Sequence, residues 1–157
     1  MKVKLIVVGK TNTAYLITGE NEYENRLKHY CKLEEIIISD VKNRSKLSIN
    51  ELKIKEGEQI LKNIESTDKV ILLDNNGEIY SSIEFSNFLK KNMLYGSKSL
   101  VFIIGGAYGF SEKVYEISNN KLSLSKMTFS HQMVRLIFKE QLYRAYTIIK
   151  GTKYHHR

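Results

Sequence analysis

The sequence predicts an α/β protein with a mostly parallel sheet flanked by helices. Two observations carry this prediction. Short apolar segments alternate along the chain with segments of helical periodicity, an order typical of repeated βα units. The apolar segments are continuous rather than alternating with polar residues, which indicates strands that are covered by other elements on both faces of the sheet.

Five short segments have the composition of buried strands, because each is apolar and most are rich in β-branched residues. They are residues 3–9, 36–38, 69–74, 100–104 and 122–125. Glycine or aspartate stands at or directly after the end of several of them. The triplet Asn75-Asn76-Gly77 predicts a turn directly after the third segment.

Helical periodicity is found in the segments between these strands, at residues 20–32, 51–64, 81–94, 111–117 and 130–149. The helix at 81–94 can begin at Ser81 or Ser82, with Glu84 as the partner in a capping box. The last helix is the longest, and Gly151 is expected to end it. Its apolar stripe consists of Val134, Ile137, Phe138, Leu142, Ala145 and Ile149.

Length and composition favour one globular domain over residues 1–157, since 42% of the residues are hydrophobic and 27% are charged. A membrane span is not expected, because the chain has no run of about 18 apolar residues. The opening apolar run is too short for a signal peptide, and Cys31 has no second cysteine to pair with. We therefore expect a cytoplasmic protein.

Positive charge is concentrated at the end of the chain. The net charge is +8, and residues 121–157 contain eight lysines and arginines against Glu140 alone. A basic cluster of this kind favours a polyanion such as RNA as the partner. The alternative is a solvated helix face. Arg135, Lys139 and Arg144 lie off the apolar stripe of the last helix and belong to this cluster.

The loops after Asp74, Ile104 and Ser125 are the candidate ligand loops, because parallel sheets bind ligands beyond the carboxyl ends of their strands. The run Gly105-Gly106-Ala107-Tyr108-Gly109 allows close backbone approach to a ligand, or else forms a tight turn. Asp74 can be a ligand contact or a turn former. Residues 121–131 are rich in hydroxyl groups, with Thr128 or Ser130 as a helix cap.

A metal site is not expected. The candidate ligands are His29, Cys31, His155 and His156, and the chain has no C-x-x-C or H-x-x-x-H spacing. Adjacent histidines rarely converge on one ion.

The motifs of these loops, taken in order, resemble a known family. They are Leu73-Asp74 with Gly77, the run from Phe102 to Gly109, the segment L-S-L-S-K-M-T-F-S-H at 122–131, the segment E-Q-L-Y-R-A at 140–145 and the ending Gly151-x-x-Tyr154-His155. The opening residues 4–9 and the run E-G-E-Q at 56–59 match as well. Over essentially the whole chain this pattern resembles the ribosomal RNA large subunit methyltransferase H family, small enzymes of the SPOUT class.

The resemblance implies an α/β domain with a C-terminal trefoil knot that works as a homodimer and binds S-adenosylmethionine in a bent form. It implies methylation of N3 of a pseudouridine in 23S rRNA on the assembled ribosome. The implied cofactor contacts are Leu73, Gly105, Leu124, Ser125, Lys126, Met127, Thr128 and Phe129. Two departures from the family pattern are Ser130, where the family usually has proline, and the extra His156 beside His155.

The reaction implied by the resemblance needs a group that removes the N3 proton, and histidine is the residue type suited to this near neutral pH. His131 and His155 are the candidates, and Arg144 is expected to grip phosphate or to stabilise the N3 anion. Arg135, Lys139, Tyr143 and Tyr154 are expected to contact RNA, the tyrosines by stacking. The structural alternatives are Tyr143 in the core and Arg144 paired with Glu140.

Two other classes of function remain open at this point. A ribosome- or RNA-binding module without catalysis would bind RNA but not the cofactor. A Rossmann-type nucleotide enzyme would have a glycine-rich loop after its first strand. Such an enzyme also has an acidic residue after its second strand, and Asp40 can fill this position. The glycine-rich loop is lacking, because the first strand is followed by the single glycine Gly9.

Overall fold

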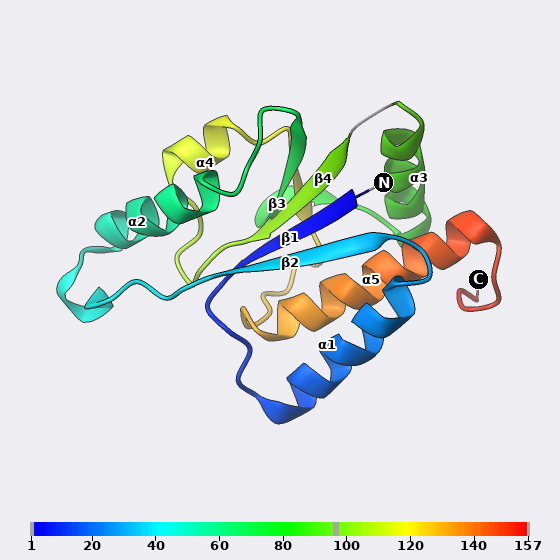
Figure 1. Ribbon diagram of the computed structural model, residues 1–157, viewed down its shortest axis with the longest axis horizontal. Coiled ribbons are helices and arrows are strands. Elements are labelled where there is room, and N and C mark those ends of the chain that lie inside the picture. Colours follow the sequence, from blue (N-terminus) through cyan, green and yellow to red (C-terminus); the bar gives the residue numbers. More distant parts are fainter. Residues whose placement is uncertain (1, 96–97, 157) are drawn as a thin grey trace.

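The computed structural model describes residues 2–95 and 98–156. Its centre is a five-stranded sheet in the order β2-β1-β4-β3-β5 (Figure 1). The strands are β1 (Lys2–Val8), β2 (Lys32–Ile38), β3 (Asp68–Ile79), β4 (Ser99–Ile104) and β5 (Asn120–Ser123). All neighbouring strands pair in parallel. The predicted α/β class is therefore confirmed, and all five strands place their carboxyl ends at one edge.

Helices cover both faces of the sheet (Figure 1). Helices α1 (Ala14–Leu27), α3 (Ser82–Leu94) and α5 (Met133–Lys150) pack together on one face, and α2 (Ile49–Leu61) and α4 (Glu112–Glu116) lie on the other. In the described part of the chain, no helix has both the length and the apolar character that a bilayer crossing requires.

Strand β1 shows why the strands are apolar without alternation. Val3, Leu5 and Val7 point into the core formed with α1, α3 and α5, whereas Ile6 and Val8 point into the core formed with α2 and α4. Successive side chains of a strand face opposite sides. Both sides of β1 are buried, so both sets of residues are apolar.

Several predicted boundaries were wrong. Helix α1 begins at Ala14 rather than at residue 20 and ends at Leu27, and Lys32 belongs to β2. The predicted turn at residues 75–77 lies inside β3, which continues to Ile79. Its pairing with β5 shifts register between Leu73 and Glu78, so the turn-forming residues make a bulge. A Cβ on Gly77 would lie 2.6 Å from the backbone of Leu122, which leaves room only for glycine.

Helix α5 begins at Met133 rather than at residue 130, and its N-cap residue is Gln132 rather than Thr128 or Ser130. The Ser130 hydroxyl nevertheless accepts a hydrogen bond from the Met133 N–H at 3.2 Å, which satisfies one free amide of the first turn. Gly151 has a φ of 68°, the left-handed conformation in which glycine commonly ends helices. The expected end of this helix is confirmed.

Candidate cofactor and active site

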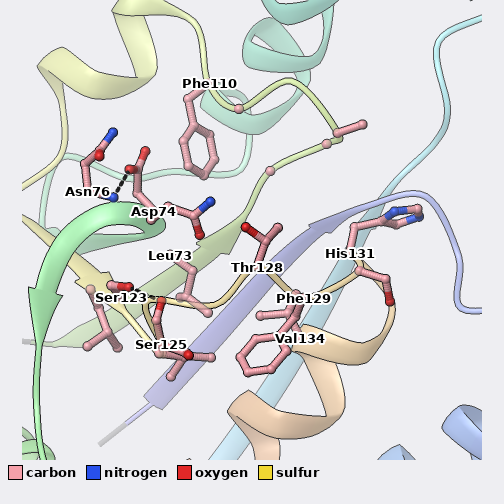
Figure 2. A pocket seen from close by; sticks show the side chains of 18 of the residues that line it. Leu73, Asp74, Asn76, Phe110, Ser123, Ser125, Thr128, Phe129, His131 and Val134 are labelled. Atoms are coloured by element: carbon pink, nitrogen blue, oxygen red, sulfur yellow. Dashed lines mark hydrogen bonds between the residues drawn. The ribbon is translucent and has the colours of Figure 1, made fainter.

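A pocket of about 550 Å³ lies at the carboxyl edge of the sheet, beyond β3, β4 and β5 (Figure 2). Three segments build it: the bulged part of β3 at residues 73–76, the loop that follows Ile104 at the end of β4, and the loop that follows Ser123 at the end of β5. The size falls within the range usual for small-molecule and cofactor sites. The lining residues are Leu73, Asp74, Asn75, Asn76, Gly105, Gly106, Ala107, Tyr108, Gly109, Phe110, Leu122, Ser123, Leu124, Ser125, Met127, Thr128, Phe129, Ser130, His131 and Val134.

The glycine-rich loop is tightly enclosed from behind. A Cβ on Gly105 would lie 2.9 Å from the Phe110 ring, and a Cβ on Gly106 would lie 2.6 Å from the Glu56 carboxylate. At Gly105 the contact is with an aromatic ring, so this position favours glycine, whereas at Gly106 the Glu56 side chain would have to move away. The lack of side chains at both positions lets a ligand approach the backbone of this loop closely.

Asp74 is fixed at the wall of the pocket by two hydrogen bonds. The Tyr115 hydroxyl donates to one carboxylate oxygen at 2.6 Å, and the Asn76 N–H donates to the other at 2.8 Å (Figure 2). Burial, together with the Asp74 carboxylate, raises the pKa of Tyr115 to about 12. The phenol therefore stays protonated and keeps its hydrogen bond at neutral pH.

The loop after β5 supplies most of the remaining wall, and its own side chains stabilise it. The Ser123 hydroxyl donates to the Ser125 carbonyl at 2.9 Å, and the Ser125 hydroxyl accepts from the Met127 N–H at 2.9 Å. Seven of the eight positions carried over as cofactor contacts line the pocket. The exception is Lys126, whose side chain is exposed and does not line it.

His131 lies at the opposite side of the pocket from Asp74 (Figure 2), directly before α5. The next residue, Gln132, fastens this corner to the loop after β1. Its side-chain oxygen accepts from the Asn12 N–H at 3.0 Å and the Thr13 N–H at 3.3 Å, and its amide donates to the Asn12 side chain at 2.9 Å. No local pattern points to Gln132, because its partners lie 119 and 120 residues away along the chain.

Arg135 and Lys139 correct the sequence analysis, which placed both on an exposed RNA-binding face. Arg135 is 1% exposed and Lys139 is 0% exposed. The Arg135 guanidinium donates to the Val8 carbonyl at 2.6 Å and to the Thr11 hydroxyl at 3.1 Å. These side chains are not available to RNA, because they are enclosed by α1 and the sheet.

The Lys139 ammonium lies among three carboxylates, at 2.5 Å from Glu20, 2.6 Å from Glu24 and 3.0 Å from Glu35. Burial alone would lower the pKa of Lys139, but the hydrogen bonds to Glu20 and Glu24 outweigh it and the pKa is raised. Burial raises the pKa of Glu35. The oxygens of the three acids lie within 4.8 Å of one another, and the lysine neutralises part of their charge.

The other predicted site residues lie together near the far end of α5. The Tyr154 hydroxyl donates to Glu140 at 3.1 Å, and the Arg144 Nε donates to the same carboxylate at 3.0 Å. The Arg144 guanidinium covers the Tyr154 ring at 4.8 Å. The ion pair between Arg144 and Glu140 is confirmed. The rings of Tyr143 and Tyr154 meet edge to face at 4.7 Å.

His155 follows this group and is half-buried, and its Nδ1 is buried without a hydrogen-bond partner in the described part of the chain. Helix α5 has 18 residues, which gives a length of about 27 Å. His131 and the pocket lie at one end of it, and Tyr154 and His155 lie beyond the other. Arg157, part of the predicted basic cluster, lies outside the described residues.

A parallel α/β sheet with a ligand pocket at its carboxyl edge defines a nucleotide-type ligand-binding fold, and comparison with known proteins gives the family. Residues 1–155 match the model of a family described as predicted SPOUT methyltransferase. The chain belongs to the SPOUT methyltransferases, and the resemblance seen in its motifs is confirmed.

Curated relatives match over the full length of the chain. The ribosomal RNA large subunit methyltransferase H of Parabacteroides distasonis is 53% identical over 156 residues, which is 99% of each chain. The protein of the same name from Flavobacterium psychrophilum is 54% identical over 157 residues, which is 100% of each chain.

A solved structure supports the fold. A probable methylase family protein from Haemophilus influenzae Rd KW20 has a TM-score of 0.50 and 13% sequence identity. The match covers 95% of this chain and 66% of that chain. At this identity the likeness concerns the fold alone.

Proposed function

We propose that this chain binds S-adenosylmethionine in the pocket and transfers its methyl group to N3 of a pseudouridine in 23S rRNA of the assembled ribosome. One observation carries the proposal. The strand-end loops that the family pattern assigns to the cofactor converge on one pocket, although they come from residues 73–76, 105–110 and 122–131 of the chain.

The residues of the pocket fit this cofactor. Leu73, Phe129 and Val134 offer apolar surface, and Gly105, which has no side chain, lets an adenosine approach the backbone at the pocket wall. Asp74 places a carboxylate on the wall, which suits a cationic group such as an ammonium. When bound, S-adenosylmethionine supplies an already activated methyl group, so the protein has to position the acceptor and exclude water.

His131 is the candidate for the base, because it lines the pocket and its side chain is exposed to an incoming nucleotide. His155 is the other candidate for the base, and Arg144 is the candidate for stabilising the N3 anion. Tyr154 and Tyr143 belong to the group around Arg144 and are candidates for stacking on the nucleobase of the target nucleotide. This group is remote from the pocket of its own chain, since Arg144 lies roughly 16 Å along α5 from Met133.

This separation favours a homodimer in the active enzyme. If the second protomer places the end of its α5 over the pocket, Arg144 and His155 reach the nucleotide held beside His131. Within the described residues, the 18-residue helix α5 separates the two groups of its own chain. The trefoil knot implied by the family belongs to the same proposal, with the loop at 122–131 as its ligand-binding part.

The proposal is tested by transfer of a labelled methyl group from S-adenosylmethionine to ribosomes that lack the modification, followed by mapping of the labelled nucleotide. We expect label on one pseudouridine of 23S rRNA. Binding to ribosomes without transfer would favour the non-catalytic RNA-binding module instead.

The base is tested by pH–rate profiles of the wild type, His131→Ala and His155→Ala. We expect one of the two changes to remove the limb of the profile that reports the base. Retention of the same limb in both variants would show that neither histidine takes the proton.

A further inference from the structure

The correction of Arg135 and Lys139 leaves open which cations of this chain meet the rRNA. We propose that the phosphates next to the target nucleotide bind a basic rim beside the pocket, formed by Lys10, Lys42, Arg44 and Lys46. The inference rests on the proposed function, because it assumes that RNA is the substrate. It concerns lysines and an arginine in the loops after β1 and β2, to which no individual role was assigned from the sequence.

The topology places these residues on the correct edge of the molecule. Strand β1 ends at Val8 and β2 ends at Ile38, and both run parallel to β4. In a parallel sheet every loop that follows a strand emerges at the same edge. The loops that carry the rim therefore lie along the edge that holds the pocket, with β1 next to β4 in the strand order.

Direct contacts join the first part of the rim to the His131 side of the pocket. Gln132 holds the backbone of Asn12 and Thr13 at 3.0 and 3.3 Å, and Arg135 holds Thr11 at 3.1 Å. Lys10 immediately precedes this fastened segment and is exposed. A nucleotide that reaches His131 therefore brings its phosphates close to Lys10.

Two acids join the second part of the rim to the same edge. The Asp40 carboxylate lies against Gly9, where a Cβ would be 3.0 Å away, and Asp40 pairs with Arg44 at 3.8 Å. The Glu56 carboxylate lies behind Gly106 of the pocket loop. Helix α2 carries Glu56 and begins at Ile49, directly after the segment that holds Lys42, Arg44 and Lys46.

The rim has positive charge that is free to bind phosphate. All four rim side chains are exposed, and within the described residues Lys10, Lys42 and Lys46 take part in no ion pair. The two acids of the same segment are engaged, Asp40 with Arg44 and Glu51 with the Ser48 N–H. On α5, by contrast, the charges of Lys139 and Arg144 are neutralised by glutamates of the same chain.

The test compares Lys10→Gln/Lys42→Gln with a matched control, Lys62→Gln/Lys98→Gln. The control lysines are also exposed, but they lie before β3 and β4, at the amino edge of the sheet. Both pairs of substitutions remove two charges from the surface. Thermal midpoints of both variants equal to that of the wild type would show that neither substitution affects the fold.

Binding to unmodified 70S ribosomes is measured over a series of salt concentrations, and S-adenosylmethionine binding is measured by calorimetry. A plot of log K against log salt has a negative slope, and each phosphate contact contributes about 0.7 to 0.9 to its magnitude. For the rim variant, which lacks two lysines, we expect this magnitude to decrease by about 1.5. We expect the KM for ribosomes to rise about tenfold and the cofactor Kd and kcat to stay unchanged, as for loss of uniform binding.

A rim variant whose slope and KM equal those of the control would overturn the inference. The proposed function fails in a different way, by absence of methyl transfer in the wild type. In that case the salt slopes still decide whether the rim binds RNA. A wild type that does not bind ribosomes would overturn both proposals.

Discussion

The Lys139 ammonium is a link between α5, α1 and β2, because its three carboxylate partners come from both of the other elements. A buried ion pair stabilises a fold little when compared with an apolar replacement of the whole group. Removal of one partner is different, since it leaves the opposite charges buried and uncompensated.

We therefore expect Lys139→Met to lower the free energy of unfolding by about 3–5 kcal/mol at neutral pH, measured by urea denaturation. Burial already raises the pKa of Glu35, and loss of the lysine would raise it further. A carboxyl with a raised folded-state pKa favours folding at low pH and loses this contribution as the pH rises through that pKa. The loss of unfolding free energy caused by Lys139→Met should therefore become smaller as the pH is lowered from 7 toward 4.5.

The control is Lys150→Met, at an exposed position of the same helix. A loss of unfolding free energy in Lys139→Met that is the same at neutral pH and at pH 4.5 would contradict this account.

The pair Tyr115 and Asp74 gives a second prediction for a single side chain. Tyr115→Phe removes the hydroxyl that holds the Asp74 carboxylate at 2.6 Å, and Asp74 lines the pocket. We expect S-adenosylmethionine affinity to fall about 3- to 10-fold, which corresponds to the loss of one hydrogen bond of about 0.5–1.5 kcal/mol. Calorimetry measures this, with Tyr95→Phe as a control at a side chain that is 80% exposed. Unchanged affinity in Tyr115→Phe would mean that Asp74 keeps its position without the phenol.

At the scale of the elements, one helix start was predicted from a local signal, since the capping box of Ser81 and Glu84 is confirmed. A second box joins Ser48 and Glu51 at the start of α2, and it was missed although its pattern is also contained in four residues, because this helix was expected to begin at residue 51. The start of α1 was missed because Thr13 makes no side-chain cap. Its free amides are instead satisfied in part by Gln132, a residue that local sequence cannot connect to this helix.

The capping boxes lead to a prediction on helix stability. Ser81→Ala should lower the free energy of unfolding by about 1 kcal/mol, because the Glu84 N–H loses its acceptor. Hydrogen bonds from Ser81 lower the pKa of Glu84, so this carboxylate stabilises the fold above its ordinary pKa of 4.5 and loses the effect as the pH falls through its depressed pKa. The difference in unfolding free energy between the wild type and Ser81→Ala should therefore become smaller as the pH is lowered. Denaturation curves measure it, and a difference that widened in acid would exclude the capping box as its source.

At the scale of the whole molecule, the sequence predicted the site better than the surface. The loops expected after Asp74, Ile104 and Ser125 were found because parallel strands end at one edge. In the structure the first of these segments is the bulge of β3, and all three line one pocket. The basic face was assigned wrongly at Arg135 and Lys139, since a helical pattern distinguishes polar from apolar positions but does not show that Glu20, Glu24 and Glu35 meet the lysine. Long-range pairing of charges has no local signature.

The last prediction concerns the assembly, and it follows from the length of α5. His131 lies at the pocket before this helix, whereas Arg144 lies toward its far end and His155 beyond it. If an active site combines the pocket of one protomer with the α5 end of the other, then His131→Ala and Arg144→Ala inactivate different halves of it. A homodimer of either variant then has the same substitution in both of its active sites and is inactive.

Mixing the two inactive variants after unfolding and refolding them together should then restore activity. With random pairing half of the dimers are mixed, and each mixed dimer has one complete site, so we expect about one quarter of the wild-type activity. Methyl transfer to unmodified ribosomes measures it, and each variant refolded alone is the control. If each site is built within one chain, every site in the mixture contains one substitution, and activity stays at the level of the separate variants. The mixture therefore decides between a shared and a self-contained active site without a structure of the dimer.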